Sequence, residues 1–428
     1  MKPSVNYVSA DEALGHVRSG DRVYVGSNCG QPVALTDALA RRDDLQQVEV
    51  VHLLTMGSAA YCEDDRFWHK GFFIAPNTRR AHDQGRADYV PVFLSEIPWL
   101  FMKGRMPLDV ALVCVSPPDE HGFCSFGISV DLGPSACKSA RLVIAEVDSQ
   151  MPRTHGDSWI HIDDIDYFVA SERPILEYLP EPPDDVSKSI AKHINHLVRD
   201  GATIQTGIGK IPSAVLETLT DKNDLGVHTE MFSDALIHAV DRGNINCRKK
   251  SLHINHVVSS FAIGSKELYE HVNDNPFYSF HPSEYVNDPF VVAQNEDMVA
   301  INGAIEVDLT GQVVSDSIGH RVYSGIGGQV DFIRGAARSR GGRPIIALPS
   351  VTNKGETKIV PTLKPGAGVV TSRGDVHYVV TEHGIADLHG QSLGERCEAL
   401  IAVADPAYRD ELETAAKELG IWRHPRWV

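Results

Sequence analysis

The chain has 428 residues, a formal net charge of −17 and seven scattered cysteines without a CxxC pair. This length suits two domains of roughly 200 residues each, and the negative charge excludes nucleic acid or an anionic membrane as the main partner, because both require a basic face. The cysteine spacing predicts neither a disulfide framework nor a zinc site.

No apolar run approaches the roughly 20 residues of a membrane-spanning helix, and the first residues lack the apolar stretch of a signal peptide. We therefore expect a cytoplasmic protein. Any anionic ligand must be held locally, by backbone N–H groups in glycine-rich turns or at helix starts, since these groups do not contribute to the net charge.

The first half of the chain predicts a β-α-β order. Its strand, turn, helix and second strand lie at 21–26, 27–31, 32–42 and 48–54. After a proline-rich acidic stretch at 179–185, a helix is followed by the same order. These elements lie at 186–201, 202–207, 208–210, 211–220 and 226–231. The repetition indicates an internal duplication; the alternative is a chance similarity between two generic β-α-β units.

A second similarity between the halves is an apolar strand followed by Glu-His-Gly, which occurs in residues 110–127 and again in residues 376–390. It places His121 and His383 in matching turns, where we expect structural hydrogen bonds rather than acid-base roles. The region 265–297 is rich in aromatic and turn-forming residues. We expect an irregular excursion there, near an edge or an interface, and a homo-oligomer (dimer or higher).

Apolar, β-branched strands that alternate with helices predict the α/β class: two tandem, related domains with mostly parallel sheets. The predicted domains are residues 1–180 and 185–428, and the second contains Glu230. Ligands of such sheets bind beyond the carboxyl ends of the strands, so the cleft between the two domains is the expected active site.

The duplication places VHLLTMG (51–57) over VHTEMFS (227–233), so that Leu54 corresponds to Glu230. An apolar strand-end position in one half is thus a carboxylate in the other. The alternatives are a solvated glutamate, or one that pairs with a nearby cation. His228 and Glu230 form an HxE pair, but no second histidine follows at helical spacing, so no metal site is predicted.

Two glycine-rich turns are further candidates. TGIGKIP (206–212) follows a strand and opens a helix, which presents free N–H groups to an anion. YSGIGGQVDFIRGAARS (323–339) contains glycines that let the backbone approach a ligand closely. The alternative for this second segment is a tight strand-to-helix turn, and the first segment is not a Walker loop, because GxxxxGKS or GxxxxGKT is absent. The lysines that could contact phosphates are Lys210, Lys354, Lys358 and Lys364.

Four segments together resemble the acetyl-CoA hydrolase/transferase family, in particular its 4-hydroxybutyrate CoA-transferase branch within the class I CoA-transferases. They are IQTGIGKIPSAVLETL, GVHTEMFSD, YSGIGGQVDFIRGAARSRGGRPIIALPS and VVTEHGIADLHGQSLGERCEALIAVADPAYRDEL. The likeness spans nearly the whole chain. It implies two related α/β domains and a glutamate that carries CoA as a thioester, with no metal and no tightly bound cofactor.

Matched motif to motif, the resemblance implies Glu230 as the catalytic glutamate and the N–H of Gly328 as the oxyanion donor. The residues implied to bind CoA are Gly207, Ile208, Gly209, Lys210, Ile211, Asn302, Gly303, Ala304, Ile305, Gly327 and Gln329. The chain departs from the family pattern at Ala235, where a glycine is frequent, and at Gly30-Gln31-Pro32, where GEP is frequent. Both departures leave the identity of the acid open.

The implied reaction is ping-pong transfer of CoA from an acyl-CoA, acetyl-CoA or succinyl-CoA, to a small carboxylic acid. Compatible acceptors are 4-hydroxybutyrate, butyrate and a dicarboxylate such as itaconate. Two alternatives stay open at this point. One is an acyl-CoA hydrolase on the same scaffold, in which water resolves the intermediate, and the other is a non-catalytic or nucleotide-binding α/β protein.

Overall fold

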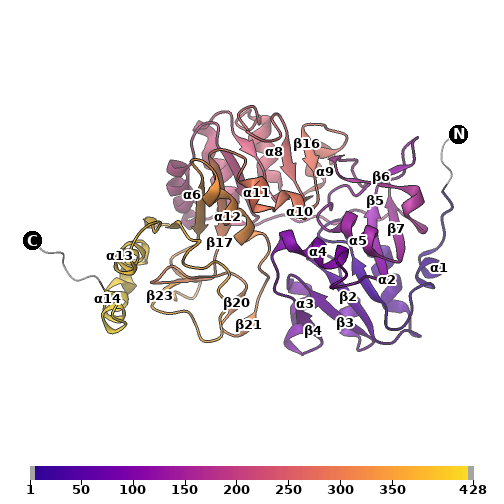
Figure 1. Ribbon diagram of the computed structural model, residues 1–428, viewed down its shortest axis with the longest axis horizontal. Helices are drawn as coiled ribbons and strands as arrows, with labels where there is room; N and C mark the ends of the chain where they lie inside the picture. Colours follow the sequence, from indigo (N-terminus) through magenta and orange to yellow (C-terminus); the bar gives the residue numbers. More distant parts are fainter. Residues whose placement is uncertain (1–4, 423–428) are drawn as a thin grey trace, which may run out of the picture. The chain divides into compact units, whose positions relative to one another are not determined.

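The computed structural model describes residues 5–422, which form two compact units (Figure 1). Unit 1 contains the residues up to Leu179 together with Glu230–Asp234 and His256–Asn287. Unit 2 contains Pro180–Thr229, Ala235–Asn255 and the residues from Asp288 on. The units differ from the predicted domains, 1–180 and 185–428, in the two later segments that pack with unit 1.

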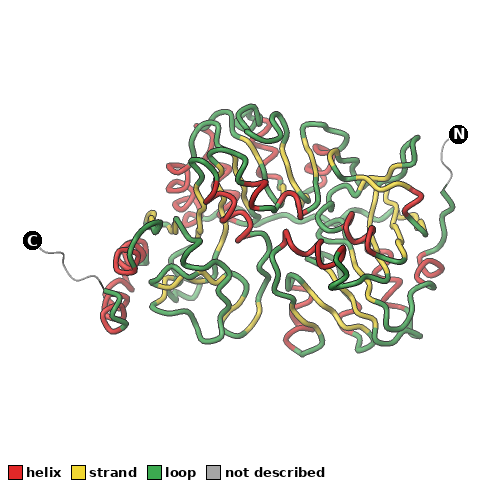
Figure 2. Tube along the Cα trace, viewed as in Figure 1, coloured by secondary structure: helices red, strands yellow, loops and turns green. Residues whose placement is uncertain are grey.

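Seven parallel strands form the main sheet of unit 1, in the order β10-β7-β5-β1-β2-β3-β4. They are β1 (Arg22–Val25), β2 (Val48–His52), β3 (Phe67–Gly71), β4 (Ala87–Tyr89), β5 (Val110–Val115), β7 (Leu142–Asp148) and β10 (Tyr167–Ser171). The helices are α1 (Ala10–Leu14), α2 (Val33–Arg41), α3 (Pro76–Asp83), α4 (Ile97–Met102) and α5 (Gly133–Ser139). Strands β5 and β7 are buried along their whole length. Such burial requires cover on both faces, and Figure 2 shows helices on both sides of these strands.

Short strands tie the later segments into unit 1. Strand β16 lies parallel between β14 and β8, β13 is parallel to β15, and β6 is antiparallel to β9. Their bounds are β6 (Phe123–Ser125), β8 (His155–Gly156), β9 (Trp159–His161), β13 (Met231–Phe232), β14 (Val257–Ser259), β15 (Phe261–Ala262) and β16 (Tyr278–Phe280). Of these pairings, that of β16 with β8 joins the later segment His256–Asn287 to the first 179 residues, which explains why this segment belongs to unit 1.

The prediction of an irregular excursion over 265–297 is wrong. This region holds α9 (Lys266–Val272), β16, α10 (Ser283–Val286) and α11 (Pro289–Val292). Two of its helices begin at a capping side chain, because Ser265 accepts a hydrogen bond from Leu268 N–H and Asp288 accepts one from Phe290 N–H. These elements are short and rich in turn-forming residues, so the sequence pattern did not predict them.

Unit 2 has a six-stranded sheet in the order β12-β11-β17-β22-β24-β25, parallel except for the edge strand β25. These strands are β11 (Thr203–Thr206), β12 (Gly226–Val227), β17 (Met298–Gly303), β22 (Arg343–Ala347), β24 (Tyr378–Thr381) and β25 (Gly384–Asp387). The helices are α6 (Asp185–Leu197), α7 (Lys210–Thr218), α8 (Asp234–Asp241), α12 (Gln329–Arg338), α13 (Leu393–Val403) and α14 (Arg409–Glu418). Outside the main sheet lie β18 (Glu306–Asp308), β19 (Val313–Val314), β20 (Ser317–Ile318), β21 (Arg321–Val322) and β23 (Ile359–Val360).

The two main sheets repeat one topology. The order β2-β1-β5-β7-β10 in unit 1 has its counterpart in β12-β11-β17-β22-β24 in unit 2. The predicted fold class, two related α/β domains with mostly parallel sheets, is confirmed. The predicted match between 110–127 and 376–390 is wrong, because it pairs β5 with β24, whereas the strand order pairs β5 with β17. The shared Glu-His-Gly is therefore outside the repeat.

Two further properties concern the whole described chain. None of the helices among residues 5–422 has both the length and the hydropathy to cross a membrane. All seven cysteines are buried free thiols. Burial raises the pKa of the thiols, for example to about 11 for Cys29, so these groups are protonated at neutral pH.

Candidate active site

Glu230 lies just before β13, at the point where the chain leaves unit 2 after Thr229. Its backbone carbonyl accepts three hydrogen bonds within unit 1, from Ser260 N–H at 3.0 Å, Phe261 N–H at 3.1 Å and Ser259 Oγ at 3.1 Å. The parallel pairing of β13 with β15 continues this contact. Backbone bonds therefore fix the position of Glu230, and its side chain is partly exposed.

The carboxylate of Glu230 has a defined partner. Asn287 Nδ2 donates a hydrogen bond to Glu230 Oε2 at 2.8 Å. Asn287 is fully buried and caps the C-terminus of α10, where its own N–H donates to Ser283 O. An amide donor on one oxygen fixes the orientation of a carboxylate. The sequence reasoning missed Asn287, because nothing local relates this residue to Glu230.

In unit 2, a cavity of about 400 Å³ gathers two of the predicted segments. Gly207, Ile208, Gly209, Lys210 and Ile211 line it together with Asn302 and Gly303. The sheet explains this meeting, because β11 and β17 are parallel neighbours with Thr206 beside Ile301, so both strands end at the same edge. The lining also includes Asp184, Ser187, Pro349 and Asn353, which the sequence analysis did not select.

The glycines of this cavity leave open space. A Cβ added at Gly207, Gly209 or Gly303 would meet no atom within 4 Å. Gly209 has a φ of 113°, a conformation that L side chains rarely adopt, and it directly precedes α7. The first N–H groups of α7 have no acceptor inside the helix, so they can bind an anion in this space.

Lys210 is held by two carboxylates. Its Nζ lies 3.0 Å from Glu181 Oε2 and 3.3 Å from Asp184 Oδ2. These hydrogen bonds, to Glu181 first and then to Asp184, raise the pKa of Lys210 above its ordinary value. The predicted phosphate-binding lysine therefore has anionic partners from the acidic stretch 179–185.

The second glycine-rich turn also reaches this region. Gly327 has a φ of 57°, and Gly328 is the residue before α12. The side chain of Gln329 donates from Nε2 to Gly303 O at 2.6 Å. Of the remaining predicted residues, Ala304 accepts a hydrogen bond from Lys358 Nζ at 3.1 Å, and Ile305 N–H donates to Val314 O.

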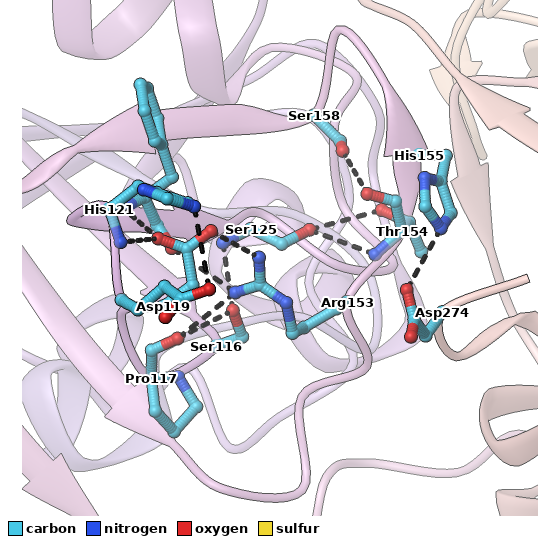
Figure 3. Close-up of polar contacts among 12 residues, drawn as sticks. Ser116, Pro117, Asp119, His121, Ser125, Arg153, Thr154, His155, Ser158 and Asp274 are labelled. Carbon is cyan, nitrogen blue, oxygen red and sulfur yellow. Dashed lines mark hydrogen bonds and ion pairs between the residues drawn. The ribbon is translucent and has the colours of Figure 1, made fainter. Parts of the chain in front are cut away.

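The turns that contain His121 and His383 make local contacts. The His121 backbone N–H donates to Asp119 Oδ1 at 2.9 Å, and Asp119 also pairs with Arg153 (Figure 3). The imidazole of His121 is largely exposed. In unit 2 the His383 N–H donates to Thr381 Oγ1, and its ring lies 3.8 Å from Asp405 Oδ2. These bonds shape the two turns through their backbones.

No group of three or more His, Cys, Asp and Glu side chains suited to a metal ion occurs among residues 5–422. The predicted absence of a tightly bound cofactor stays a prediction, and so does the cleft between the two domains. The structure thus assembles two candidate regions, each inside one unit: the Glu230 carboxylate with Asn287, and the glycine-lined cavity with Lys210.

Comparisons with known proteins agree on one family. Residues 5–180 match the acetyl-CoA hydrolase/transferase N-terminal domain, and residues 264–416 match the C-terminal domain of the same family. The chain is 47% identical to a 4-hydroxybutyrate coenzyme A transferase from Clostridium kluyveri, covering 96% of this chain and 97% of that protein. It is 46% identical to a succinyl-CoA:acetate/propanoyl-CoA:succinate CoA transferase from Fasciola hepatica, covering 95% and 87%.

Solved structures show the same fold over the whole length. A 4-hydroxybutyrate CoA-transferase from Porphyromonas gingivalis superposes with a TM-score of 0.83 at 40% identity, covering 96% of this chain and 97% of that chain. RipA from Yersinia pestis gives a TM-score of 0.91 at 35% identity, covering 97% of this chain. The chain therefore belongs to the acetyl-CoA hydrolase/transferase family, among its CoA-transferases.

Proposed function

We propose that this enzyme transfers CoA by a ping-pong route in which Glu230 carries CoA as a thioester. The observation that supports this role is the placement of a partly exposed carboxylate on a fixed backbone, with one oxygen oriented by Asn287. A thioester is an activated acyl group, so a carboxylate can attack it without a general base.

The proposed reaction is balanced at each step. Glu230 attacks the thioester carbonyl, the C–S bond breaks, and a mixed anhydride and a CoA thiolate form. The thiolate attacks the glutamyl carbonyl, the anhydride C–O bond breaks, and the first acid leaves as a carboxylate. The second carboxylate then attacks glutamyl-CoA and the two steps run in reverse, which returns the Glu230 carboxylate and releases the new acyl-CoA.

Backbone N–H groups are proposed to stabilise the charged intermediates. Each tetrahedral intermediate carries negative charge on one oxygen, and the N–H of Gly328 is our candidate donor. A preorganised donor of this kind contributes about 3 to 4 kcal/mol to the transition state. The open space at Gly207, Gly209 and Gly303 supports close approach of the CoA chain to the backbone in unit 2.

The proposed donors are acetyl-CoA and succinyl-CoA, and the proposed acceptors are 4-hydroxybutyrate, butyrate and an itaconate-like dicarboxylate. The names of the relatives support small acids of this kind, because they include 4-hydroxybutyrate, succinate and butyrate. A family member from Yarrowia lipolytica is named an acetyl-CoA hydrolase. Dependence of acyl-CoA consumption on an added carboxylate separates transfer from hydrolysis. The proposed partners remain acyl-CoA, small carboxylates and a second copy of the chain.

The test is direct detection of the intermediate. Incubation with acetyl-CoA, without an acceptor, should add CoA to the peptide that contains Glu230, as measured by mass spectrometry. Glu230→Ala should lose both the adduct and CoA exchange, whereas Glu267→Ala, at an exposed glutamate of unit 1, should keep both. Full exchange by Glu230→Ala, or an adduct on another residue, would refute the proposal.

A further inference from the structure

The side chain of Gln329 is the centre of a buried hydrogen-bond network inside unit 2. Its Nε2 donates to Gly303 O at 2.6 Å, and its Oε1 accepts from Ser315 Oγ and from Thr371 Oγ1, each at 2.9 Å. Gln329 is only 8% exposed and Thr371 is fully buried. Both acceptor positions of the amide oxygen are therefore filled by the protein itself.

This network joins three separate chain segments. Gly303 ends β17 and lines the glycine-rich cavity. Ser315 follows β19, and Thr371 lies beside the same strand, because its N–H donates to Val313 O. Ser315 Oγ also approaches Gly303 O at 3.2 Å. One amide thus fixes the end of β17 relative to the turn that opens α12.

We propose that Gln329 is a positioning residue for CoA transfer. Its side-chain amide fixes the turn at Gly327 and Gly328 relative to Gly303, which lines the cavity. The inference rests on the proposed function and deepens it. The resemblance implied that Gln329 binds CoA, and this stays a prediction. Because the network fills both acceptor positions of the amide oxygen, the effect that we infer for this residue passes through Gly303 and Gly328.

The chemistry of the network requires an amide at this position. The Gly303 carbonyl needs a donor, and the two hydroxyl groups need an acceptor. A carboxylate satisfies the hydroxyl groups, but it faces the carbonyl oxygen with a second oxygen and repels it. A protonated carboxyl group restores the donor. The network thus predicts a dependence on pH that general damage to the fold would not produce.

The variant Gln329→Glu tests this prediction. Loosening the turn should lower kcat about a hundredfold, the effect of a misplacement of about 1 Å in a catalytic group. The KM for acyl-CoA should change much less, and the thermal midpoint should stay near that of the parent. Burial raises the pKa of the introduced carboxyl group, so the ratio of parent kcat to variant kcat should shrink as the pH falls. Gln294→Glu, the same change at an exposed glutamine of unit 2, is the matched control.

Unchanged kcat in Gln329→Glu, or a loss that acid does not relieve, overturns the inference. If that variant fails to fold, Gln329→Met keeps the length of the side chain but removes the donor to Gly303 O and the acceptor for both hydroxyl groups, and an unchanged kcat there has the same meaning. The proposed function fails separately, through full exchange by Glu230→Ala. An inactive Glu230→Ala beside a fully active Gln329→Glu would therefore reject the positioning role alone.

Discussion

The turns that follow β1 and β11 occupy equivalent places in the two sheets, yet they are packed in opposite ways. The turn of unit 1, residues 26–32, is buried throughout, and a Cβ added at Gly30 would lie 2.6 Å from Ser129 Oγ. The turn of unit 2, residues 207–212, is half-buried, and a Cβ at Gly207 would meet nothing within 4 Å. The first copy uses glycine for close packing, whereas the glycine of the second copy leaves open space.

The next strand end differs in the same sense. Leu54 follows β2, and its carbonyl accepts a hydrogen bond from Asn28 N–H at 2.6 Å. In unit 1 this strand end is therefore bonded to the turn that follows β1. The matching Glu230 leaves the β12 region and bonds through its carbonyl to Ser260 and Phe261. The matching strand ends thus differ: one carries a leucine whose carbonyl bonds to its own turn, and the other carries a partly exposed carboxylate.

The largest loss of activity should follow the replacement of Asn287, the hydrogen-bond donor to the Glu230 carboxylate. Leu54, which matches Glu230 in unit 1, has an apolar side chain and needs no such donor. Asn287→Ala removes the donor to Glu230 Oε2. Loss of a hydrogen bond to a charged group costs about 1.5 to 3 kcal/mol, so kcat/KM should fall about tenfold to a hundredfold. The measurement is steady-state exchange together with the rate of CoA adduct formation on Glu230.

Asn273→Ala is the matched control for this variant. Asn273 also uses its amide in unit 1, where Oδ1 accepts from Arg153 N–H at 2.9 Å, but it does not contact Glu230. Activity should survive its loss. An equal loss of activity in both variants would mean that Asn287 acts through the general stability of unit 1 rather than through the carboxylate.

A pair of glycine variants tests the two turns directly. Gly207→Ala should raise the KM for acyl-CoA about tenfold, which is what a pocket loses to one extra methyl group. Its thermal midpoint should not change, because the methyl group has space. Gly30→Ala should do the reverse: overpacking costs about 1 to 3 kcal/mol of folding stability. Ser129 cannot easily move, since its Oγ donates to Ser27 O at 2.6 Å.

Thermal unfolding and acyl-CoA titration of both variants decide the matter. If Gly207→Ala destabilised the protein and left KM unchanged, the turn of unit 2 would be a structural turn like that of unit 1. If Gly30→Ala left the thermal midpoint unchanged, the close contact with Ser129 would not constrain the first copy.

The sequence alone predicted the features that depend on local pattern. Hydrophobic periodicity and glycine positions located β11, the turn at 208–210 and α7, and parallel sheets explain why this turn meets Asn302 and Gly303. The match of Leu54 with Glu230 needed only the repeat. These inferences hold because each rests on residues close together in the chain or on a rule about strand ends.

Features that depend on distant contacts escaped prediction. Asn287 meets Glu230 only because β16 and the one-turn helix α10 fold back into unit 1. The Glu-His-Gly similarity misled, since short motifs after apolar strands do not reveal the place of a strand in a sheet. The ion pairs of Lys210 with the acidic stretch 179–185 were also not predicted, because the positions of charged residues in the sequence do not show which of them form pairs.

The smallest expected effect concerns this acidic stretch, which has no counterpart at the turn of unit 1. Glu181 and Asp184 form ion pairs with Lys210, and Glu181 is largely exposed. If the phosphates of CoA bind Lys210, as the resemblance implied, they must compete with these carboxylates for the ammonium group. Glu181→Gln should therefore lower the KM for acyl-CoA by about twofold to fivefold, the range that an exposed ion pair supports.

The dependence of KM on ionic strength distinguishes this competition for Lys210 from other causes of a lower KM. The gain in Glu181→Gln should shrink as ionic strength rises, because exposed charges are screened within about 10 Å at 0.1 M salt. Glu217→Gln makes the same charge change at an exposed position of α7 and should leave KM unchanged. An equal decrease in both variants would assign the effect to the net charge of the protein. No decrease in Glu181→Gln would mean that Lys210 does not meet the phosphates, and that the cavity binds CoA through backbone N–H groups alone.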